Sequence, residues 1–446
     1  MAVAGGVQLA VRSAGTGPPR LLVLLGSGET APTMIKLHRA IFGQLGPPPV
    51  AAALLDTPYG FQENADDISA RAVAYFRDSV GHDVEVAELR RREDGNPVRR
   101  EASLARLAAA RWVFAGPGSP TYSLRQWRGT EVPALLADKL AQGGCVAFAS
   151  AAALTLGRYT VPVYEIYKSG ADPQWVDGLD LVTPILGPDV AVIPHYDNAE
   201  GGTHDTRHCY LGERRLRLLE EQLPAQGWVL GVDEHTACVL DVGAGTATVV
   251  GAGGVTARRH GRSATATTGS VLPIPELVGL LRRKVPASTA TPVPQVTPSS
   301  PAPAGPRDPS PFHTDIRRLE EASEAAVAAR DVDGAVRALL ELEDTIHAWA
   351  ADTLDSDAAS RARGALRRMV SRLGDLARAG AQEPEAAVGP YVTALLAERA
   401  AARAARRWSD ADRIRDALAG AGVEVRDTPG GTVWQLAPPA EAAAER

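Results

Sequence analysis

The chain has 446 residues, of which 45% are apolar, 22% charged and 5% aromatic. This balance is typical of globular proteins and excludes a wholly disordered, fibrous or collagen-like chain, and the length allows two or three domains. The 47 basic and 53 acidic residues leave a net charge of -6, which excludes a global field attracting nucleic acid, so that any such contact must be local.

Short apolar runs alternate with amphipathic stretches in the N-terminal part of the chain. The pattern predicts helices at 66–80 and 132–142, and strands at 21–25, 50–55, 84–89, 112–115, 145–149 and 190–193. Alternation of strands and helices favours an α/β domain built on a parallel sheet. Between 228 and 255 the pattern changes to short β runs broken by Gly, which indicates antiparallel hairpins at the end of the domain.

Ser150 is a candidate nucleophile because of the residues around it. It follows a buried apolar run and precedes the Ala-rich start of a helix. A strand-to-helix turn with small neighbours can hold a serine in a strained conformation, where the helix N-terminus stabilises developing negative charge. Read locally, Ser150 could equally be a helix N-cap, a position that Ser favours.

His195 and Glu165 are the candidate partners of Ser150. His195 follows a predicted strand, at the sheet edge where open α/β sheets place active-site groups, and Glu165 lies between Ser150 and His195 in an aromatic context. In this order the three residues form a nucleophile, an orienting acid and a base. The backbone N–H groups of Gly118, in a glycine turn, and of Ala151 are the candidate oxyanion donors.

The segment 197–210 is dense in polar and charged residues. His204 and His208 are four residues apart and could contribute to a divalent metal site, but no metal-binding motif frames them. We therefore predict no metal and no cofactor, and we expect either substrate contacts or a plain surface loop. The candidate substrate-binding residues in and after this segment are Asn198, Arg207 and Arg214.

The order of these motifs resembles that in the dipeptidase E and cyanophycinase serine peptidases, whose fold is like the class I glutamine amidotransferases. The resemblance covers about residues 18–283 and is carried by Gly26-Ser-Gly28, Gly116-Pro-Gly118, Ala149-Ser150-Ala-Ala-Ala, Pro194-His195 and Gly231-Val-Asp-Glu-His-Thr-Ala237. It implies a nucleophile at Ser150, a base at His195 and, from the spacing, an acid at Glu165.

The nucleophile turn departs from the pattern of that family. The family reads Gly-x-Ser-Ala-Gly-Ala, whereas Phe148 and Ala152 replace both glycines in this chain. Ala for Gly is a small change, but Phe for Gly is a large one. A Phe148 ring that filled the space above Ser150 would favour a binding protein over an enzyme.

A proline-rich segment, 285–311, divides the chain. It holds nine prolines among 27 residues and predicts an extended linker between domains at 1–284 and 312–446. The three cysteines, Cys145, Cys209 and Cys238, form no CxxC motif, and no apolar run is long enough to span a membrane. We therefore expect a cytoplasmic protein without membrane contacts.

The C-terminal part has the periodicity of a helical domain. Helices are predicted at 316–329, 332–350, 357–379 and 388–419, with a short β tail at 423–436. A stripe of arginines lies beside an aromatic residue and could contact phosphates while the ring stacks on a base. Equally, the stripe could be a solvated helix face with internal ion pairs. The residues concerned are Arg399, Arg403, Arg407 and Trp408.

The tail Asp427-Thr-Pro-Gly-Gly-Thr-Val-Trp434, with Glu398-Arg399 and Ala411-Asp412 before it, resembles the C-terminal end of cysteinyl-tRNA synthetase over about residues 388–436. The resemblance implies recognition of the anticodon end of tRNA, with Trp434 and the arginine stripe as contacts. The nucleotide signatures and zinc cysteines of the synthetase core are missing from the sequence, so we predict that the chain does not activate cysteine.

These observations predict an α/β, class I glutamine-amidotransferase-like domain joined to a helical domain with a short β tail. The expected function is a serine-nucleophile hydrolase acting on a small peptide, an amide or an aminoacyl group, with a module that could bind tRNA. The alternative is a catalytically inactive tRNA- or protein-binding protein that keeps both folds. The oligomeric state stays open.

Overall fold

The computed structural model describes residues 17–93, 96–199, 204–280, 311–349, 358–380, 384–428 and 431–437. The chain divides into two compact units, which are described separately. Unit 1 comprises Met1–Arg307 and His347–Asp357, and unit 2 comprises Asp308–Ile346 and Ala358–Arg446. The predicted linker at 285–311 lies outside the described residues except for Pro311, the first residue of a helix.

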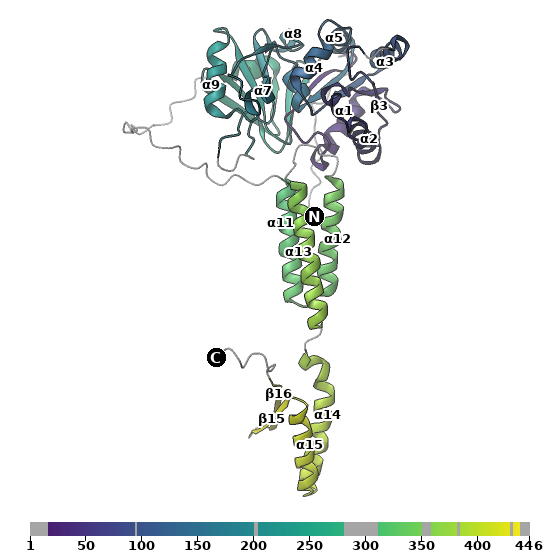
Figure 1. Ribbon diagram of the computed structural model, residues 1–446, viewed down its shortest axis with the longest axis vertical. Helices are drawn as coiled ribbons and strands as arrows, with labels where there is room; N and C mark the ends of the chain where they lie inside the picture. Colours follow the sequence, from purple (N-terminus) through teal and green to yellow (C-terminus); the bar gives the residue numbers. More distant parts are fainter. Residues whose placement is uncertain are drawn as a thin grey trace, which may run out of the picture. The chain divides into compact units, whose positions relative to one another are not determined.

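Unit 1, most of which is coloured purple to teal in Figure 1, contains an eight-stranded sheet in the order β14-β11-β10-β1-β5-β4-β2-β3. The five strands from β1 to β3 in this order run parallel, and β10, β11 and β14 extend the sheet with antiparallel pairs. The strands are β1 (Arg20–Leu25), β2 (Ala52–Leu54), β3 (Glu85–Val86), β4 (Trp112–Ala115), β5 (Gly144–Ala149), β10 (Thr236–Asp241), β11 (Thr246–Gly251) and β14 (Val271–Pro273).

A second, six-stranded sheet in unit 1 has the order β13-β12-β9-β8-β6-β7. Its central pairs β6–β8 and β8–β9 are parallel, and the outer pairs are antiparallel. The strands are β6 (Tyr159–Thr160), β7 (Val176–Asp177), β8 (Val190–Ile193), β9 (Trp228–Val232), β12 (Gly254–Arg259) and β13 (Arg262–Thr267). The antiparallel pairs expected between 228 and 255 belong to different sheets. β10 and β11 form a hairpin in the eight-stranded sheet, and β9 pairs with β12 in the six-stranded sheet.

Alternation along β1 explains why this strand is central to the core. Leu22 and Leu24 face one hydrophobic cluster, and Leu21, Val23 and Leu25 face another, all fully buried. A strand buried on both faces is an uninterrupted apolar run, as parallel sheets require. Side chains from α3, α4 and α5 pack in the first cluster and side chains from α1 and α2 in the second, so helices cover both faces.

The helices of unit 1 connect these strands and cover the sheets. They are α1 (Ile35–Leu45), α2 (Ala65–Ala74), α3 (Pro97–Ala109), α4 (Pro120–Trp127), α5 (Val132–Gln142), α6 (Ser150–Leu154), α7 (Val163–Tyr167), α8 (Thr183–Leu186), α9 (Gly212–Gln222) and α10 (Ile274–Gly279). Two short 3₁₀ turns, η1 (Pro32–Met34) and η2 (Thr57–Tyr59), and a π turn, η3 (Tyr75–Val80), complete the set.

Unit 2 is helical with a β-hairpin, as the sequence predicted. Its helices are α11 (Pro311–Ala328), α12 (Val332–Ala348), α13 (Ala358–Ala379), α14 (Pro384–Ala404) and α15 (Trp408–Gly420), and the hairpin pairs β15 (Val423–Thr428) with β16 (Gly431–Leu436). The helical periodicity at 388–419 corresponds to a pair of helices, as expected for 395–418, and the chain turns between Ala404 and Trp408 with Arg406 at a φ of 57°. Within the described ranges, no helix has the length and apolarity needed to cross a bilayer.

Candidate active site

Ser150 stands at the turn from β5 into α6, in a conformation that non-glycine residues rarely adopt. Its φ is 48°, in the left-handed region, and the residue is only 7% exposed. The turn is held because the N–H of Ala152 donates to the carbonyl oxygen of Gly116 at 3.2 Å. Strained backbone of this kind concentrates at functional sites, and a helix cap does not require it.

His195 lies at the end of β8, from where its ring reaches Ser150. The Ser150 hydroxyl and His195 Nε2 are 3.1 Å apart, within hydrogen-bond range. His195 also has a positive φ, of 48°, and its N–H donates to the carbonyl oxygen of Gly26 at 3.2 Å. The structure therefore brings together the ends of β1, β5 and β8, and places a serine beside a histidine that is 4% exposed.

Glu234 is the acid that contacts His195. It lies in the connection from β9 to β10, and its Oε1 accepts from His195 Nδ1 at 2.7 Å and from Asn198 Nδ2 at 2.9 Å. Burial alone would raise the pKa of Glu234, but the hydrogen bonds from His195 and Asn198 outweigh it and leave the pKa below its ordinary value. The group is therefore an ionised carboxylate at neutral pH, able to stabilise a protonated imidazole.

The expectation that Glu165 orients His195 is wrong on this geometry. Glu165 lies on α7, and its Oε1 accepts from the hydroxyl of Thr121 at 2.7 Å. Spacing along the chain places Glu165 15 residues after Ser150 but does not show which acid lies beside His195 in the fold. The acid instead comes from the segment that crosses from one sheet to the other.

Glu234 belongs to the motif from Gly231 to Ala237, in which nothing in the sequence marks this residue as the partner of His195. Two features of the structure show why that motif matters. Asp197 Oδ1 accepts from the N–H of Glu234 at 2.7 Å, which fixes the acid's backbone. A Cβ on Gly26 would lie 1.9 Å from the carbonyl oxygen of Asp233, so only glycine allows the loop after β1 to pack against this segment.

The proposed oxyanion donors lie in the loop after β4, at Gly118, and directly after Ser150, at Ala151. Gly118 has a φ of 139°, and a Cβ there would lie 2.0 Å from the carbonyl oxygen of Pro58. The loop after β4 is thus locked against η2, because the N–H of Ser119 also donates to Pro58 at 2.8 Å. Ala151 is in the first turn of α6, whose N–H groups have no partner within the helix.

Phe148 does not cover Ser150. The ring is fully buried in the hydrophobic cluster that also contains Leu22 and Leu24 of β1, and its centroid lies 5.7 Å from that of Trp127. The hydrogen bond between Ser150 and His195 is made in its presence. The replacement of a glycine by Phe148 is therefore accommodated in the core.

Two of the three expected substrate-binding residues, Asn198 and Arg207, bond to other side chains. Asn198 is fully buried and donates to Glu234, so it supports the acid rather than facing solvent. Arg207 forms a two-pronged ion pair with Asp205, through Nε at 2.8 Å and Nη2 at 2.7 Å. Arg214 is exposed on α9, and no hydrogen bond in the described part of the chain joins it to Ser150, His195 or Glu234.

The polar segment 204–213 is held by an internal ionic network. Arg258 is 5% exposed and donates to both Glu213 and Glu220 at distances of 2.9–3.0 Å. His208 contacts Glu213 at 3.3 Å, and burial lowers the pKa of His208 to about 4. Among the residues with a described position, no three His, Cys, Asp or Glu side chains are arranged to hold a metal ion.

Glu29 is a buried carboxyl group beside the site that the sequence did not single out. It is 1% exposed, and its Oε1 lies 3.0 Å from where a Cβ of Gly116 would be. Burial raises the pKa of Glu29, with only partial compensation from a backbone N–H and from His195. Its Oε2 has no hydrogen-bond partner in the described structure.

In unit 2, the expected arginine stripe is largely neutralised by the hairpin. Arg399 is 6% exposed and forms a bidentate ion pair with Asp427 of β15, with two hydrogen bonds of 2.9 Å. Arg403 donates to the same carboxylate at 2.6 Å. Thr432 donates to Asp427 as well, at 2.9 Å. The prediction that Arg399 and Arg403 contact phosphates is therefore corrected: the two arginines tie α14 to the hairpin.

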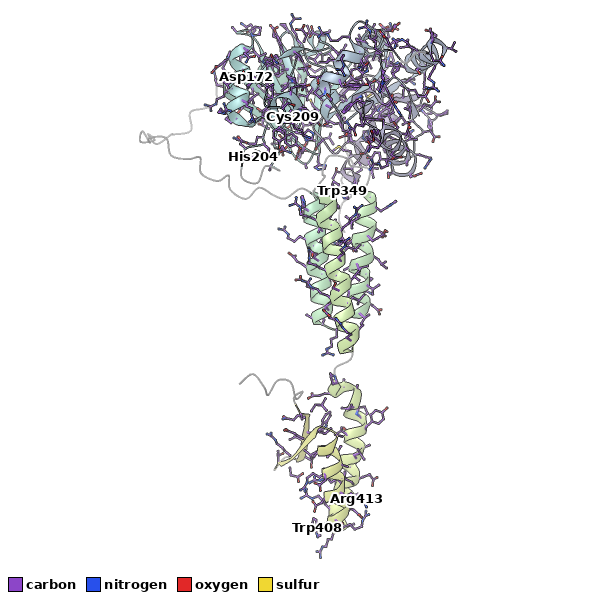
Figure 2. The ribbon with its side chains drawn as sticks, viewed as in Figure 1. Asp172, His204, Cys209, Trp349, Trp408 and Arg413 are labelled. Carbon is purple, nitrogen blue, oxygen red and sulfur yellow. The ribbon has the colours of Figure 1, made fainter. Side chains whose placement is uncertain are left out.

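The remaining predicted tRNA contacts divide into one exposed group and one packed group. Trp408 is 58% exposed at the start of α15 (Figure 2), next to Arg407, which pairs with Asp410 at 3.1 Å. Trp434 instead packs in the small core of α14, α15 and the hairpin, with its ring 3.5 Å from the Cβ position of Gly389. Of the predicted aromatic contacts, only Trp408 presents its ring to solvent.

The comparisons with known proteins separate the two ends of the chain. Residues 386–434 match the family model of the cysteinyl-tRNA ligase anticodon binding domain, which confirms the resemblance predicted for this segment. A cysteine–tRNA ligase of Kocuria rhizophila is 46% identical over 119 residues, which are 25% of this chain and 25% of that protein. The chain thus spans about a quarter of the length of this curated relative.

Two of the solved structures that are similar to the chain carry the name of a peptidase. One is a peptidase from an acI-B1 Actinobacterium, with a TM-score of 0.47 and 21% identity over 57% of this chain and 97% of that one. Another is a candidate peptidase E protein from Listeria monocytogenes, with a TM-score of 0.34 and 14% identity over 54% and 98% of the two chains. 

Proposed function

We propose that unit 1 is a serine-nucleophile hydrolase of a small peptide, an amide or an aminoacyl group. The observation that carries the proposal is the hydrogen-bonded series Ser150–His195–Glu234, with bonds of 3.1 and 2.7 Å and with Ser150 in a strained turn. A nucleophile beside a base, and a base oriented by a third group, is the arrangement that activates a hydroxyl.

The reaction follows from the positions of the protons. Ser150 Oγ attacks the substrate carbonyl carbon while its proton passes to His195 Nε2. The imidazolium then gives that proton to the departing amine or alcohol, and an ester of Ser150 remains. Water attacks this ester, with His195 accepting a proton from the water and returning it to Ser150 Oγ, so that the acid product leaves and the enzyme is restored.

Other groups stabilise the charges that form in this sequence. Glu234 is ionised and faces His195 Nδ1, so it stabilises the imidazolium and fixes the orientation of the ring. The N–H groups of Gly118 and Ala151 are assigned to the oxyanion. Their support is the glycine-only conformation at Gly118 and the position of Ala151 in the first turn of α6.

We further propose that the C-terminal segment contacts tRNA through the surface around Trp408. The support is the match of residues 386–434 to an anticodon binding domain and the exposed ring beside Arg406 and Arg407. We also propose a cytoplasmic location. Its support is that the thiols of Cys145, Cys209 and Cys238 are free and buried, as is usual in a reducing compartment.

The hydrolase proposal is tested by labelling the full chain with a fluorophosphonate, followed by peptide mass spectrometry. We expect one adduct on Ser150, lost in Ser150→Ala and His195→Ala and kept in the control Ser169→Ala, whose side chain is exposed on a different loop. If folded protein gave no adduct on Ser150, a binding protein that keeps both folds would be the better assignment.

The tRNA proposal is tested by filter binding of the full chain to total tRNA at low salt. We expect weak binding that Arg406→Glu and Arg407→Glu reduce and that Arg363→Glu, on the exposed face of α13, does not. Each lost phosphate contact should lower the log–log salt slope by about 1. Binding that is indifferent to these reversals would make the segment a protein-interaction domain.

A further inference from the structure

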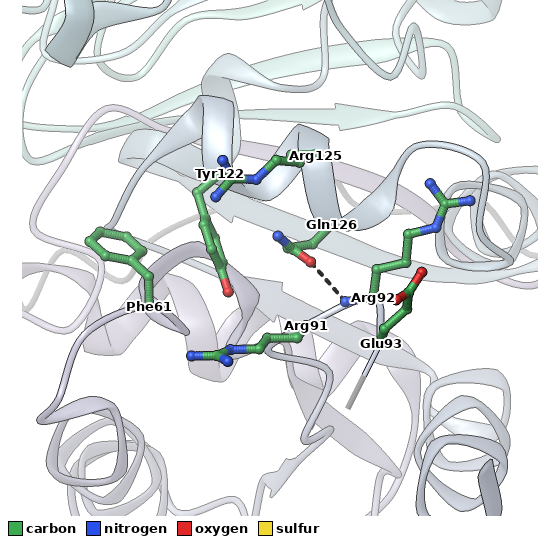
Figure 3. Close-up of a pocket in the computed structure, with 7 residues that line it drawn as sticks. All are labelled: Phe61, Arg91, Arg92, Glu93, Tyr122, Arg125 and Gln126. Atoms are coloured by element: carbon green, nitrogen blue, oxygen red, sulfur yellow. Dashed lines mark hydrogen bonds between the residues drawn. The ribbon is translucent and has the colours of Figure 1, made fainter. Parts of the chain in front are cut away.

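A basic pocket with aromatic walls lies next to the loop that follows β4. It has a volume of about 500 Å³, within the range of small-ligand sites. It is lined by Phe61, Arg91, Arg92, Glu93, Tyr122, Arg125 and Gln126 (Figure 3). Three arginines and one glutamate give this lining a formal charge of +2, in a chain whose net charge is negative.

The pocket is built on segments that also build the proposed active site. Tyr122 is in the first turn of α4, whose N-cap Ser119 follows Gly118 directly. Phe61 comes just after η2, whose Pro58 accepts from the N–H of Ser119. The pocket wall at Tyr122 thus follows the oxyanion loop within one helical turn, a rise of about 5 Å along α4.

The walls of the pocket are fixed by hydrogen bonds rather than formed by loose side chains. The hydroxyl of Tyr122 donates to the carbonyl oxygen of Arg90 at 2.9 Å, and the N–H of Arg92 donates to Gln126 Oε1 at 2.8 Å. The segment 90–92 is therefore attached to α4 at two points. A ligand would meet a preformed site, which limits the ordering cost of binding.

Two features of the pocket select the ligand. The first is the pair of guanidinium groups at Arg91 and Arg125, which Figure 3 shows on two sides of the Tyr122 ring. Arg125 lies 5.1 Å from the centroid of that ring, and among the described residues neither arginine forms an ion pair. Guanidinium groups that are not neutralised by acids are suited to phosphate oxygens.

The second feature is the ring of Phe61. It is 48% exposed although it contacts Tyr122 at a centroid distance of 5.1 Å, so one face of a large apolar ring is open to the pocket. Such a face stacks on a planar ring, as aromatic side chains stack on the bases of nucleotides. An acidic side chain of a peptide would use the arginines but would leave Phe61 uncovered.

We propose that this pocket binds a nucleotide, with the phosphate on the arginines that border Tyr122 and the base on Phe61. The substrate class of the hydrolase is then an acyl group carried on a nucleotide, with the acyl carbonyl at Ser150. The identity of the acyl carrier rests on the proposed hydrolase function, whereas the binding of the nucleotide does not.

The experiment is isothermal titration of the full chain with AMP, adenosine and inorganic phosphate at low salt. We expect AMP to bind at least about tenfold more tightly than either part, a difference of about 1.4 kcal/mol. Phe61→Ala should weaken AMP and adenosine alike, and Arg91→Ala and Arg125→Ala should weaken AMP and phosphate. The control is Arg128→Ala, at the end of the same helix α4, which should bind AMP as the unaltered chain does.

Two results would overturn the inference. One is the absence of AMP binding up to about 5 mM, well above the Kd of a weak site. The other is an aspartyl dipeptide that binds with the same dependence on Arg91 and Arg125 but no dependence on Phe61, which would make the pocket a peptide subsite. Ser150→Ala should bind AMP normally, so failure of AMP binding and failure of Ser150 labelling are separate outcomes, and circular dichroism identifies any variant that does not fold.

Discussion

Replacing Glu234 by Gln tests the charge in the proposed triad with little change of shape. Both His195 Nδ1 and Asn198 Nδ2 donate to the same oxygen, Oε1, at 2.7 and 2.9 Å. The amide oxygen of Gln can accept both bonds in the same orientation, so the ring of His195 stays in place. What is lost is the negative charge facing the imidazolium.

The size of that loss follows from the distance and the surroundings. The two charge centres are about 4 Å apart, and at an effective dielectric constant of about 20 this gives an attraction of about 4 kcal/mol. Since the side chain of Glu234 is 24% exposed, this dielectric constant is more suitable than that of a dry interior. A loss of about 4 kcal/mol in the transition state slows the reaction about 10³-fold.

The rate of fluorophosphonate labelling at Ser150 measures this effect without a known substrate. Glu234→Gln should lower the second-order rate constant about 10³-fold. The matched control is Glu165→Gln, which alters a carboxyl group bonded to Thr121 and should change the rate less than about threefold, within 0.7 kcal/mol. A large loss in the Glu165 variant with a normal rate in the Glu234 variant would refute this reading of the site.

Four further outcomes are expected. Arg258→Met should destabilise unit 1 by about 3–5 kcal/mol near neutral pH, because it leaves the buried carboxylate of Glu220 without its arginine partner and removes one of the two arginines that pair with Glu213. The deficit should shrink as pH falls from 4.5 toward about 2, the range over which hydrogen bonds from Arg258 and Arg217 lower the pKa of Glu213. An equal deficit near neutral pH and near pH 2 in denaturant titrations would contradict the ion-pair explanation. Asp427→Asn should lower the thermal stability of unit 2, since Arg399 loses its charged partner, by about 1–3 kcal/mol, and scanning calorimetry that shows no change would count against this role. Burial raises the pKa of Glu29, so ionising this carboxyl group lowers the free energy of unfolding as pH rises. Glu29→Gln has no group to ionise there, so the unaltered chain should lose more stability than the variant between about pH 4 and about pH 8. The first pH lies about 0.5 unit below the ordinary pKa of a glutamate and the second well above it. Cysteine-dependent exchange of pyrophosphate into ATP should stay at background, and robust exchange would overturn both the prediction that the chain does not activate cysteine and the hydrolase proposal for unit 1.

The sequence predicted the α/β class and the residues at strand ends for a local reason. An apolar run followed by small or polar residues marks where a buried strand ends, and both Ser150 and His195 stand at such a point. The pattern therefore marked both residues as candidates. It did not show that Ser150 follows a strand of the eight-stranded sheet and His195 a strand of the six-stranded sheet, so that their contact joins the two sheets.

Interactions between segments of different type were not predictable in this way. The acid of the site comes from a connection between the two sheets, 39 positions after His195, where no periodic pattern marks it. Likewise the helical spacing of Arg399 and Arg403 describes one face of α14 but not its partner, which lies 28 positions after Arg399 on the hairpin. Side chains that are paired across elements look unpaired in a sequence.

The pairing of β1 has a consequence for how the protein becomes active during its synthesis. This strand lies between β5 and β10, and Leu21 pairs with Asp241, so its second neighbour emerges 220 residues later. At about 5–20 residues per second, a ribosome needs on the order of ten to forty seconds to make that length. Until then one edge of β1 has no partner and can recruit chaperones or other strands. Glu234 is made just before β10, so Ser150 and His195 exist in the growing chain before their acid does, and the series Ser150–His195–Glu234 that the proposed mechanism needs is incomplete until then.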